Sequence, residues 1–180
     1  TYALPRDADA DDLVAAMLVQ FRRAFDDDLR TLAAERGLTT RQVVTLASLI
    51  QRETGLDDER PVVSAVYNNR LDRRMPLQCD PTVIYALQVD GLYDGNLTRE
   101  NLTYDSPYNT YVHPGLPPGP IAAPGAADLR AALMPADASY VYFVSRNDGS
   151  HVFADTLREH NRNVQEFQVD YFRRRRAAAR

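Results

Sequence analysis

The sequence predicts an α+β domain in which a helix-rich lobe packs with a small antiparallel β-sheet and a long Pro/Gly-rich loop borders a cleft. Three observations predict this class. Apolar residues recur at helical spacing over the first half, Pro and Gly crowd the middle, and two apolar segments flank a turn sequence near the end. A length of 180 residues with 44% hydrophobic content suits a single domain with a core of ordinary size.

The first half of the chain predicts three helices. The apolar spacing indicates one long amphipathic helix over residues 10–36, which Gly37 ends. A threonine cap at Thr39 or Thr40 opens a second helix that continues to about residue 54. Acidic residues and a proline precede the third helix, which runs over residues 61–71.

The character of the chain changes after a short helix predicted over residues 80–87. Asp80 is expected to cap that helix, with Pro81 in its first turn. Residues 90–125 are rich in Asn, Gly, Tyr and Pro, and the run over 115–121 suits neither a helix nor a central strand. Interleaved tyrosines favour an ordered loop, which we interpret as the wall of a cleft.

The last third of the chain predicts a helix, a hairpin and a final helix. Residues 126–133 have a helical pattern, and the apolar segments 140–144 and 151–153 flank the turn residues 147–149. The final helix begins near residue 155 and ends in a run of arginines. We interpret that run as a solvated helix end, with a membrane-surface role as the alternative.

Composition and charge argue against several classes of function. A net charge of -4 and a pI near 5.3 disfavour nucleic-acid binding, which needs a clustered basic face. The single cysteine, Cys79, cannot form an intramolecular disulfide, and no cysteine or histidine cluster suggests a metal site. No run reaches the roughly 18 apolar residues of a membrane span. Because the chain begins at Thr1 without an initiator methionine, we expect a fragment of a longer protein.

Glu53 stands on the wrong face of the second helix for a surface acid. It follows Ile50 by three residues and Leu46 by seven, so it projects from the apolar side. Burial there would raise the pKa of the carboxyl, and a glutamic acid protonated near neutral pH suits cleavage of a glycosidic bond. The alternative is a frayed last turn in which Glu53 reaches solvent or pairs with an arginine. The polar side of the helix is predicted to carry Arg41, Thr45, Ser48 and Arg52.

Other kinds of chemistry have weaker support in the sequence. Capping and dipole complementarity explain Asp80 and the acidic residues 57–59 without a catalytic role. The three histidines are scattered, no serine lies in a nucleophile elbow, and no Gly-rich phosphate loop follows a strand. Triad, zinc and nucleotide chemistry are therefore disfavoured, and no cofactor is expected.

Several long motifs occur together in one order. They are LASLIQRET (46–54), VYNNRL (66–71), MPLQCDPTVIYAL (75–87), SPYNTY (106–111), GLPPGPI (115–121), YVYFV (140–144), HVF (151–153) and EHN (159–161). On these motifs the chain resembles the YceG-like (MltG) family of endolytic murein transglycosylases. The resemblance covers about residues 1–169.

The resemblance implies an enzyme that cuts inside peptidoglycan strands, between N-acetylmuramic acid and N-acetylglucosamine, and leaves a 1,6-anhydromuramic end. It implies that residues 1–180 are one catalytic domain, the C-terminal part of a single-pass protein at the extracytoplasmic face of the bacterial inner membrane. An anchor and a LysM-like region would lie upstream. Peptidoglycan strands are the expected partner, with synthases of the elongation or division machinery as further candidates.

The catalytic glutamate of the family falls on Glu53. Family members often have a second acidic residue where this chain has Gln51, which leaves Glu53 as the one carboxylate in that motif. Glu53 would protonate the glycosidic oxygen and then, as a carboxylate, deprotonate the C6 hydroxyl that attacks C1. The expected substrate contacts are Asn69, Arg70, Gln78, Asp80, Thr82, Tyr108, Asn109 and Thr110.

Some roles stay open at the level of the sequence. Arg70 suits a lactyl or stem-peptide carboxylate but could pair with a nearby aspartate, and Asn161 is expected to be a buried amide that supports the fold. A hydrolytic muramidase would use Asp80 with Glu53 to direct water. A glycan-binding or division scaffold without turnover is the alternative of another class.

Overall fold

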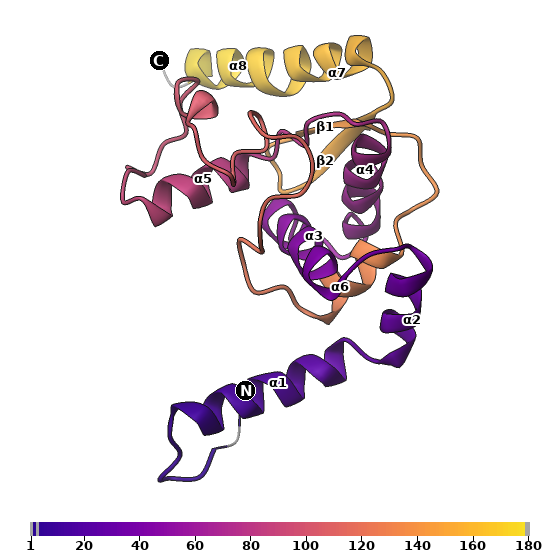
Figure 1. The fold of residues 1–180 in the computed structure, drawn as a ribbon. Helices are drawn as coiled ribbons and strands as arrows, with labels where there is room; N and C mark the ends of the chain where they lie inside the picture. Colours follow the sequence, from indigo (N-terminus) through magenta and orange to yellow (C-terminus); the bar gives the residue numbers. More distant parts are fainter. Residues whose placement is uncertain (1, 3, 179–180) are drawn as a thin grey trace.

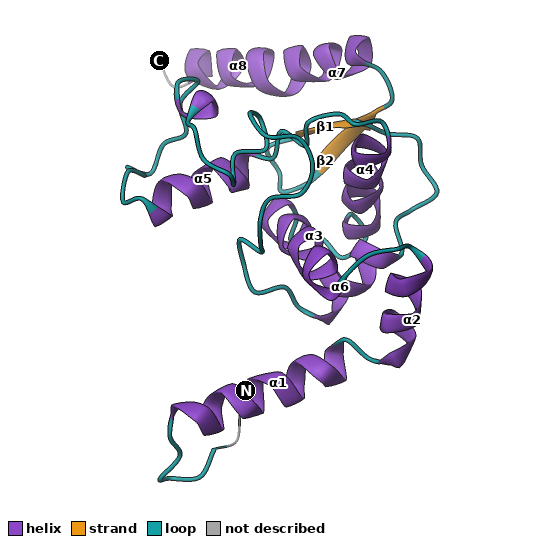
Figure 2. Ribbon diagram, in the orientation of Figure 1, coloured by secondary structure: helices purple, strands orange, loops and turns teal. Residues whose placement is uncertain are grey.

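The chain is mostly helical, with one short hairpin near its C-terminal end (Figures 1 and 2). The computed structural model describes residues 2 and 4–178. Its two strands pair antiparallel beside the helices, which confirms the predicted α+β class. The elements are α1 (Ala10–Ala24), α2 (Asp27–Glu35), α3 (Thr40–Glu53), α4 (Arg60–Asp72), α5 (Asp80–Val89), η1 (Asn101–Thr103), α6 (Ala126–Leu133), β1 (Tyr142–Ser145), β2 (His151–Ala154), α7 (Leu157–Val164), η2 (Gln165–Asp170) and α8 (Tyr171–Ala178).

The single long helix predicted over residues 10–36 is wrong, because the chain forms α1 and α2 with a break between them. The Asp26 carboxylate accepts a hydrogen bond from Leu29 N at 3.0 Å and so caps α2, an arrangement that competes with a continuous helix. Phe25, at the break, is buried in the core. α1 projects from the body (Figure 1), and it has no buried residue among those described.

α3 lies at the centre of the fold and packs on α2, α4, α5 and α6. Thr39 caps it as predicted, through a reciprocal pair of bonds with Gln42. The predicted polar side is wrong at Thr45 and Ser48, which are buried. The Ser48 hydroxyl donates to Thr45 O at 2.7 Å and accepts from Ile121 N at 3.0 Å, so these bonds make its burial tolerable.

The starts of α4 and α5 carry a proline in the first turn, as predicted. The acidic residues nearby do not cap these helices, however. Neither Glu59 nor Cys79, at the two N-cap positions, makes a side-chain cap bond, and Asp80 lies inside α5 as its first residue. Both Glu59 and Asp80 bond instead to residues that lie far away in the sequence.

The segment 90–125 is ordered, as expected, and apart from η1 it has neither helix nor strand. Buried polar side chains hold it in place: Asn109 Nδ2 donates to the carbonyls of Leu102 and Tyr104 at 3.1 and 2.7 Å. Residues 115–121 pack along α3, where Arg41 Nε donates to Pro118 O at 2.8 Å. Tyr111 of the segment 90–125 lines the cavity with Glu53, which agrees with the expected cleft wall, whereas residues 115–121 do not line that cavity.

The hairpin confirms the predicted turn at residues 147–149. β1 and β2 pair with Tyr142 opposite Ala154 and Ser145 opposite His151. Asn147 and Gly149 have φ of 67° and 94°, the left-handed conformation that asparagine and glycine adopt most readily. The short connection places His151 beside β1, at the edge of the cavity described below.

The final helical stretch crosses the top of the molecule in Figure 1 as α7, η2 and α8. Thr156 caps it, and η2 is a π-helical segment that the sequence pattern did not indicate. Asn161 is exposed, so its expected role as a buried amide is wrong. Arg173 to Arg176 are exposed, which agrees with a solvated helix end.

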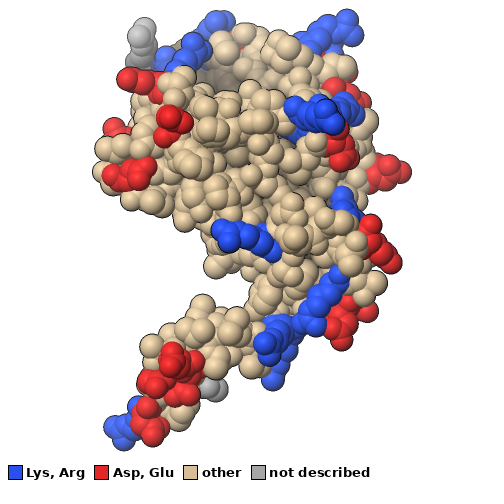
Figure 3. Space-filling model, viewed as in Figure 1, with Lys and Arg blue, Asp and Glu red and all other residues tan. Residues whose placement is uncertain are grey.

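Charged side chains are unevenly spread over the surface. Figure 3 shows a face that is largely uncharged around the centre, with acidic groups gathered at the free end of α1. None of the described helices combines the length and apolar character needed to cross a membrane.

Replacing Ser48 with Ala should destabilise the domain, because Ile121 N would lose its buried acceptor. We expect a loss of about 1–3 kcal/mol in the free energy of unfolding, measured by chemical denaturation. The matched control is Ser139→Ala, which removes a hydroxyl bonded to Asp155 at the exposed surface and should change stability by less than about 0.5 kcal/mol. Equal losses in the two variants would contradict this account.

Candidate active site

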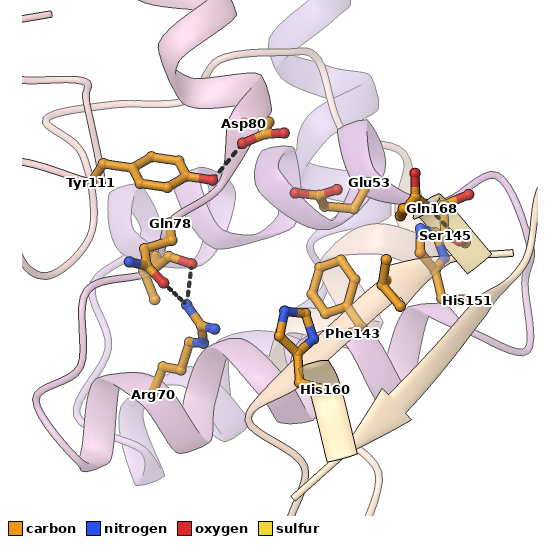
Figure 4. A pocket seen from close by; sticks show the side chains of 12 residues that line it. Glu53, Arg70, Gln78, Asp80, Tyr111, Phe143, Ser145, His151, His160 and Gln168 are labelled. Carbon is orange, nitrogen blue, oxygen red and sulfur yellow. Dashed lines mark hydrogen bonds between the residues drawn. The ribbon is translucent and has the colours of Figure 1, made fainter. Parts of the chain in front are cut away.

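A cavity of about 380 Å³ opens at the C-terminal end of α3. Its walls come from α3, α4, the segment 77–80, Tyr111, the hairpin and the final helix, which are distant in the sequence. Figure 4 shows Glu53, Asp80, Arg70, Gln78, His151 and His160 directed towards this space from different elements. The cavity therefore brings together two carboxylates, a guanidinium, two amides and two imidazoles.

Glu53, the last residue of α3, presents its carboxyl to the cavity. The Tyr67 hydroxyl, on α4, donates to Glu53 Oε1 at 2.7 Å. Burial raises the pKa of Glu53 above its ordinary value, and the nearby charge of Asp80 acts in the same direction. The bonds from Tyr67 and Cys79 and the charge of His151 oppose this rise without cancelling it. The alternative of a frayed, solvated Glu53 is therefore wrong.

Asp80 is the second carboxylate of the cavity. The Tyr111 hydroxyl donates to its Oδ1 at 2.6 Å, a bond drawn in Figure 4. Burial and the bond to Asp80 both raise the pKa of Tyr111, so its hydroxyl stays protonated and remains a donor. The long loop thus holds the Asp80 side chain through Tyr111. The capping role expected from the sequence did not predict this contact.

His151 is held by Glu59 at another edge of the cavity. Glu59 Oε2 lies 2.8 Å from His151 Nδ1, and Glu59 Oε1 accepts from His151 N at 2.8 Å. Burial alone would raise the pKa of Glu59, but these bonds and one from Thr54 hold it below its ordinary value. An ionised Glu59 fixes the ring of His151 by accepting at Nδ1.

Arg70 and Gln78 form a polar part of the cavity wall beside β1. Arg70 donates to the carbonyls of Val141, Pro76 and Leu77 at 2.6–3.0 Å and to Gln78 Oε1 at 3.2 Å. No carboxylate among the described residues pairs with it, so the expected alternative of an aspartate partner is wrong. Burial lowers the pKa of the Arg70 guanidinium. The backbone of Gln78 has a left-handed φ of 51°, which is uncommon for a residue other than glycine.

The structure places the other predicted substrate contacts away from the cavity lining. Asn69 Nδ2 donates to the carbonyls of Ala138 and Tyr140 at 2.8 and 2.9 Å, and Thr110 Oγ1 lies 2.9 Å from Thr82 Oγ1. These side chains hold the backbone around the cavity, as Asn109 does, and Tyr108 packs against Tyr85. Their contact with substrate stays a prediction. Arg70, Gln78 and Asp80 do line the cavity with Glu53.

Sequence reasoning missed several groups that the fold brings to the cavity. Tyr67 stands in the VYNNRL motif and Tyr111 in the SPYNTY motif, but no signal in the sequence placed either residue in the site. His151 and His160 stood inside quoted motifs, yet they looked scattered because no spacing links them to Glu53. Among the described residues, no group of three or more His, Cys, Asp or Glu is arranged to hold a metal ion.

Comparison with known families identifies the family of the chain. The model of the YceG-like family matches residues 1–166, which include Glu53 and the other described residues that line the cavity apart from Gln168. The chain belongs to the YceG-like family. This match confirms the predicted membership of the YceG-like family. The matched residues end before α8 begins at Tyr171.

Relatives with a functional name are among the proteins that this chain resembles. The endolytic murein transglycosylase of Bacillus subtilis is 36% identical over 161 residues, covering 89% of this chain and 44% of that protein. The endolytic murein transglycosylase of Streptococcus pneumoniae D39 is 29% identical over 176 residues, covering 92% of this chain and 30% of that protein. The chain thus spans less than half the length of these relatives.

A solved structure shows the same YceG-like fold. The crystal structure of a YceG-like protein from Listeria monocytogenes superposes with a TM-score of 0.79 at 34% identity. The likeness covers 89% of this chain and 51% of that chain.

Replacing Glu53 with Gln should stabilise the domain at neutral pH. Because the pKa of Glu53 is raised on folding, the folded state binds the proton more tightly, and stability falls as pH rises from about 4.5 through the raised pKa. Gln removes that loss, so we expect a gain of about 0.5–2 kcal/mol at pH 8 that shrinks towards pH 4. Thermal denaturation across pH measures it.

The control is Glu166→Gln, the same change at an exposed helical position. It should give no comparable pH-dependent gain. A stability difference between wild type and Glu53→Gln that stays constant from pH 4 to pH 8 would count against a buried carboxyl with a raised pKa.

Proposed function

We propose that this domain is an endolytic lytic transglycosylase, a lyase that cleaves the β-1,4 bond between N-acetylmuramic acid and N-acetylglucosamine inside peptidoglycan strands. One observation carries the proposal: the partly buried Glu53 carboxyl, whose pKa burial raises, opens into a polar cavity. The names of the relatives support the substrate and the type of product.

The first step needs a proton donor. Glu53 in its protonated form donates to the glycosidic oxygen as the bond to C1 of N-acetylmuramic acid breaks, and the released sugar leaves with a hydroxyl. Burial raises the pKa of Glu53, so more of the carboxyl keeps its proton at a given pH than in a solvated glutamate. The Tyr67 hydroxyl then stabilises the carboxylate that remains, through its 2.7 Å bond to Oε1.

The second step returns the proton to Glu53. Its carboxylate removes the proton from the C6 hydroxyl, whose oxygen forms the bond to C1 of the same sugar. A 1,6-anhydro end results, and no water is consumed. One carboxyl therefore serves as acid and then as base, so the reaction requires no second carboxylate nucleophile.

Hydrolysis is the rival reaction, because Asp80 is a second carboxylate in the same cavity. In a hydrolytic muramidase it would direct a water molecule to C1 and leave a reducing end. Its bond to Tyr111 favours a positioning role in our proposal. In that role the negative charge of Asp80 raises the pKa of Glu53.

Arg70 suits the anionic part of the substrate. Its guanidinium lines the cavity, and no carboxylate among the described residues neutralises it. The lactyl ether of N-acetylmuramic acid carries a carboxyl or a stem peptide, which offers carbonyl oxygens and negative charge. Gln78, bonded to Arg70, would contact hydroxyl or amide groups nearby.

The proposed reaction also suggests where the domain works. Peptidoglycan lies outside the bacterial inner membrane, so we place the domain at that extracytoplasmic face, held there by an anchor in the complete protein. Internal cuts act on strands that the synthases of elongation and division have made. We therefore include these synthases among the proposed partners.

Digestion of purified peptidoglycan, followed by mass spectrometry of the ends, tests the proposal. Wild type should release long strands with 1,6-anhydro ends early in the reaction. Glu53→Gln should lose about 100-fold or more of this activity, the usual contribution of a general acid. Asp80→Asn should keep the anhydro product at a reduced rate.

The other outcomes are equally distinct. Reducing ends that disappear in Asp80→Asn would support the muramidase. Binding of strands without any cleavage would support a glycan-binding scaffold. Short products released first from strand ends would contradict an endolytic enzyme.

Replacing Tyr67 with Phe should move the alkaline limb of the pH–rate profile to higher pH. The hydroxyl favours the ionised form of Glu53, so its loss raises the pKa of the acid further. The measurement is kcat/KM for strand cleavage between pH 4 and pH 9. Tyr104→Phe is the matched control, because its hydroxyl bonds to the Asp90 carboxylate outside the cavity at 2.6 Å. A limb that moves to lower pH in Tyr67→Phe would contradict this role.

A further inference from the structure

His160 is a cavity residue to which the proposed reaction gives no task. It lies on α7, and its ring stacks on the Tyr142 ring at 5.1 Å between centroids, with 24° between the planes. The Arg70 guanidinium lies over the same Tyr142 ring, 5.3 Å from its centroid. The imidazole therefore has a fixed orientation, and Figure 4 shows it directed into the cavity beside Phe143.

The two ring nitrogens of His160 have different surroundings. Nδ1 is buried and has no hydrogen-bond partner among the described residues. Burial and the charge of Arg70 lower the pKa of His160, so the ring is neutral near pH 7 and carries one proton. A buried N–H without an acceptor is rarer than an unpaired acceptor, which places the proton on Nε2. Nε2 then offers an N–H to the cavity.

We propose that His160 donates from Nε2 to the carbonyl oxygen of a 2-acetamido group of the bound glycan, and that Phe143 packs against its methyl group. This subsite for an N-acetylated sugar deepens the proposed function and rests on it. It assigns a task to His160, which lines the same cavity as Glu53.

The chemistry of this wall favours an acetamido group over a hydroxyl or a carboxylate. A neutral imidazole attracts a carboxylate less than Arg70 does, and Arg70 is available elsewhere in the cavity. The Phe143 ring and Val144 make the adjoining strand apolar. An acetamido group joins a strong acceptor to a methyl group, so it satisfies both the N–H and the apolar wall. Holding this group orients the sugar whose glycosidic bond meets Glu53.

The test combines two variants with two substrates. His160→Phe keeps an aromatic ring against Tyr142 and removes the donor, whereas His160→Gln keeps an N–H donor near the position of Nε2. The substrates are de-N-acetylated peptidoglycan strands and the same strands re-acetylated with acetic anhydride. His113→Phe, at an exposed histidine of the long loop, is the matched control.

On re-acetylated strands, we expect kcat/KM of His160→Phe to fall about 10- to 100-fold, the effect of leaving a polar substrate group unpaired. On de-N-acetylated strands its loss should be below about threefold, and His160→Gln should recover part of the acetyl preference. His113→Phe should match wild type on both substrates. Equal losses of His160→Phe on the two substrates would overturn the assignment.

Binding measurements separate this inference from the lyase proposal. Binding can be measured in Glu53→Gln, because binding does not require turnover. The ratio of its affinities for re-acetylated and de-N-acetylated strands is compared with the same ratio for Glu53→Gln/His160→Phe. Loss of the preference in the double variant supports the subsite even if wild type cleaves neither substrate. A preference that persists in the double variant refutes the subsite, whatever the outcome for catalysis.

Discussion

The hydrogen bond from the Tyr67 hydroxyl to the Glu53 carboxyl is the constraint on which the site depends. It joins the end of α3 to α4 and gives a buried acid a partner in each protonation state. Burial raises the pKa of Glu53, while the bond limits the rise, a balance that suits the acid and base roles that we propose for this group.

The walls of the cavity are held by polar groups that do not themselves face it. Asn109 and Thr110 hold the long loop through buried hydrogen bonds, and Ser48 attaches that loop to α3. These bonds keep Tyr111 against Asp80. Motifs that look like substrate contacts because they are rich in amides and hydroxyls can instead be the scaffold of a site, since buried backbone groups need partners.

The local elements were largely predictable, and the errors have local causes. Caps, prolines and apolar spacing indicated α3, α4, α5, α6 and the hairpin, because these signals act within a few residues. The break at Asp26 was missed, because a side-chain cap outweighed continuous periodicity. The π-helical η2 has no simple sequence signature, and the face of α3 was misjudged because a serine can be buried when it is bonded.

The sequence by itself determined the family and the fold class, and the helical spacing placed Glu53 on an apolar face. The role of Glu53 as the catalytic acid stays a prediction. The tertiary structure alone decided what surrounds Glu53. Tyr67, Asp80, His151 and His160 reach one cavity from separate elements. Their distances and pKa shifts depend on burial and on charges that meet only when the chain folds, and no spacing along the sequence encodes them.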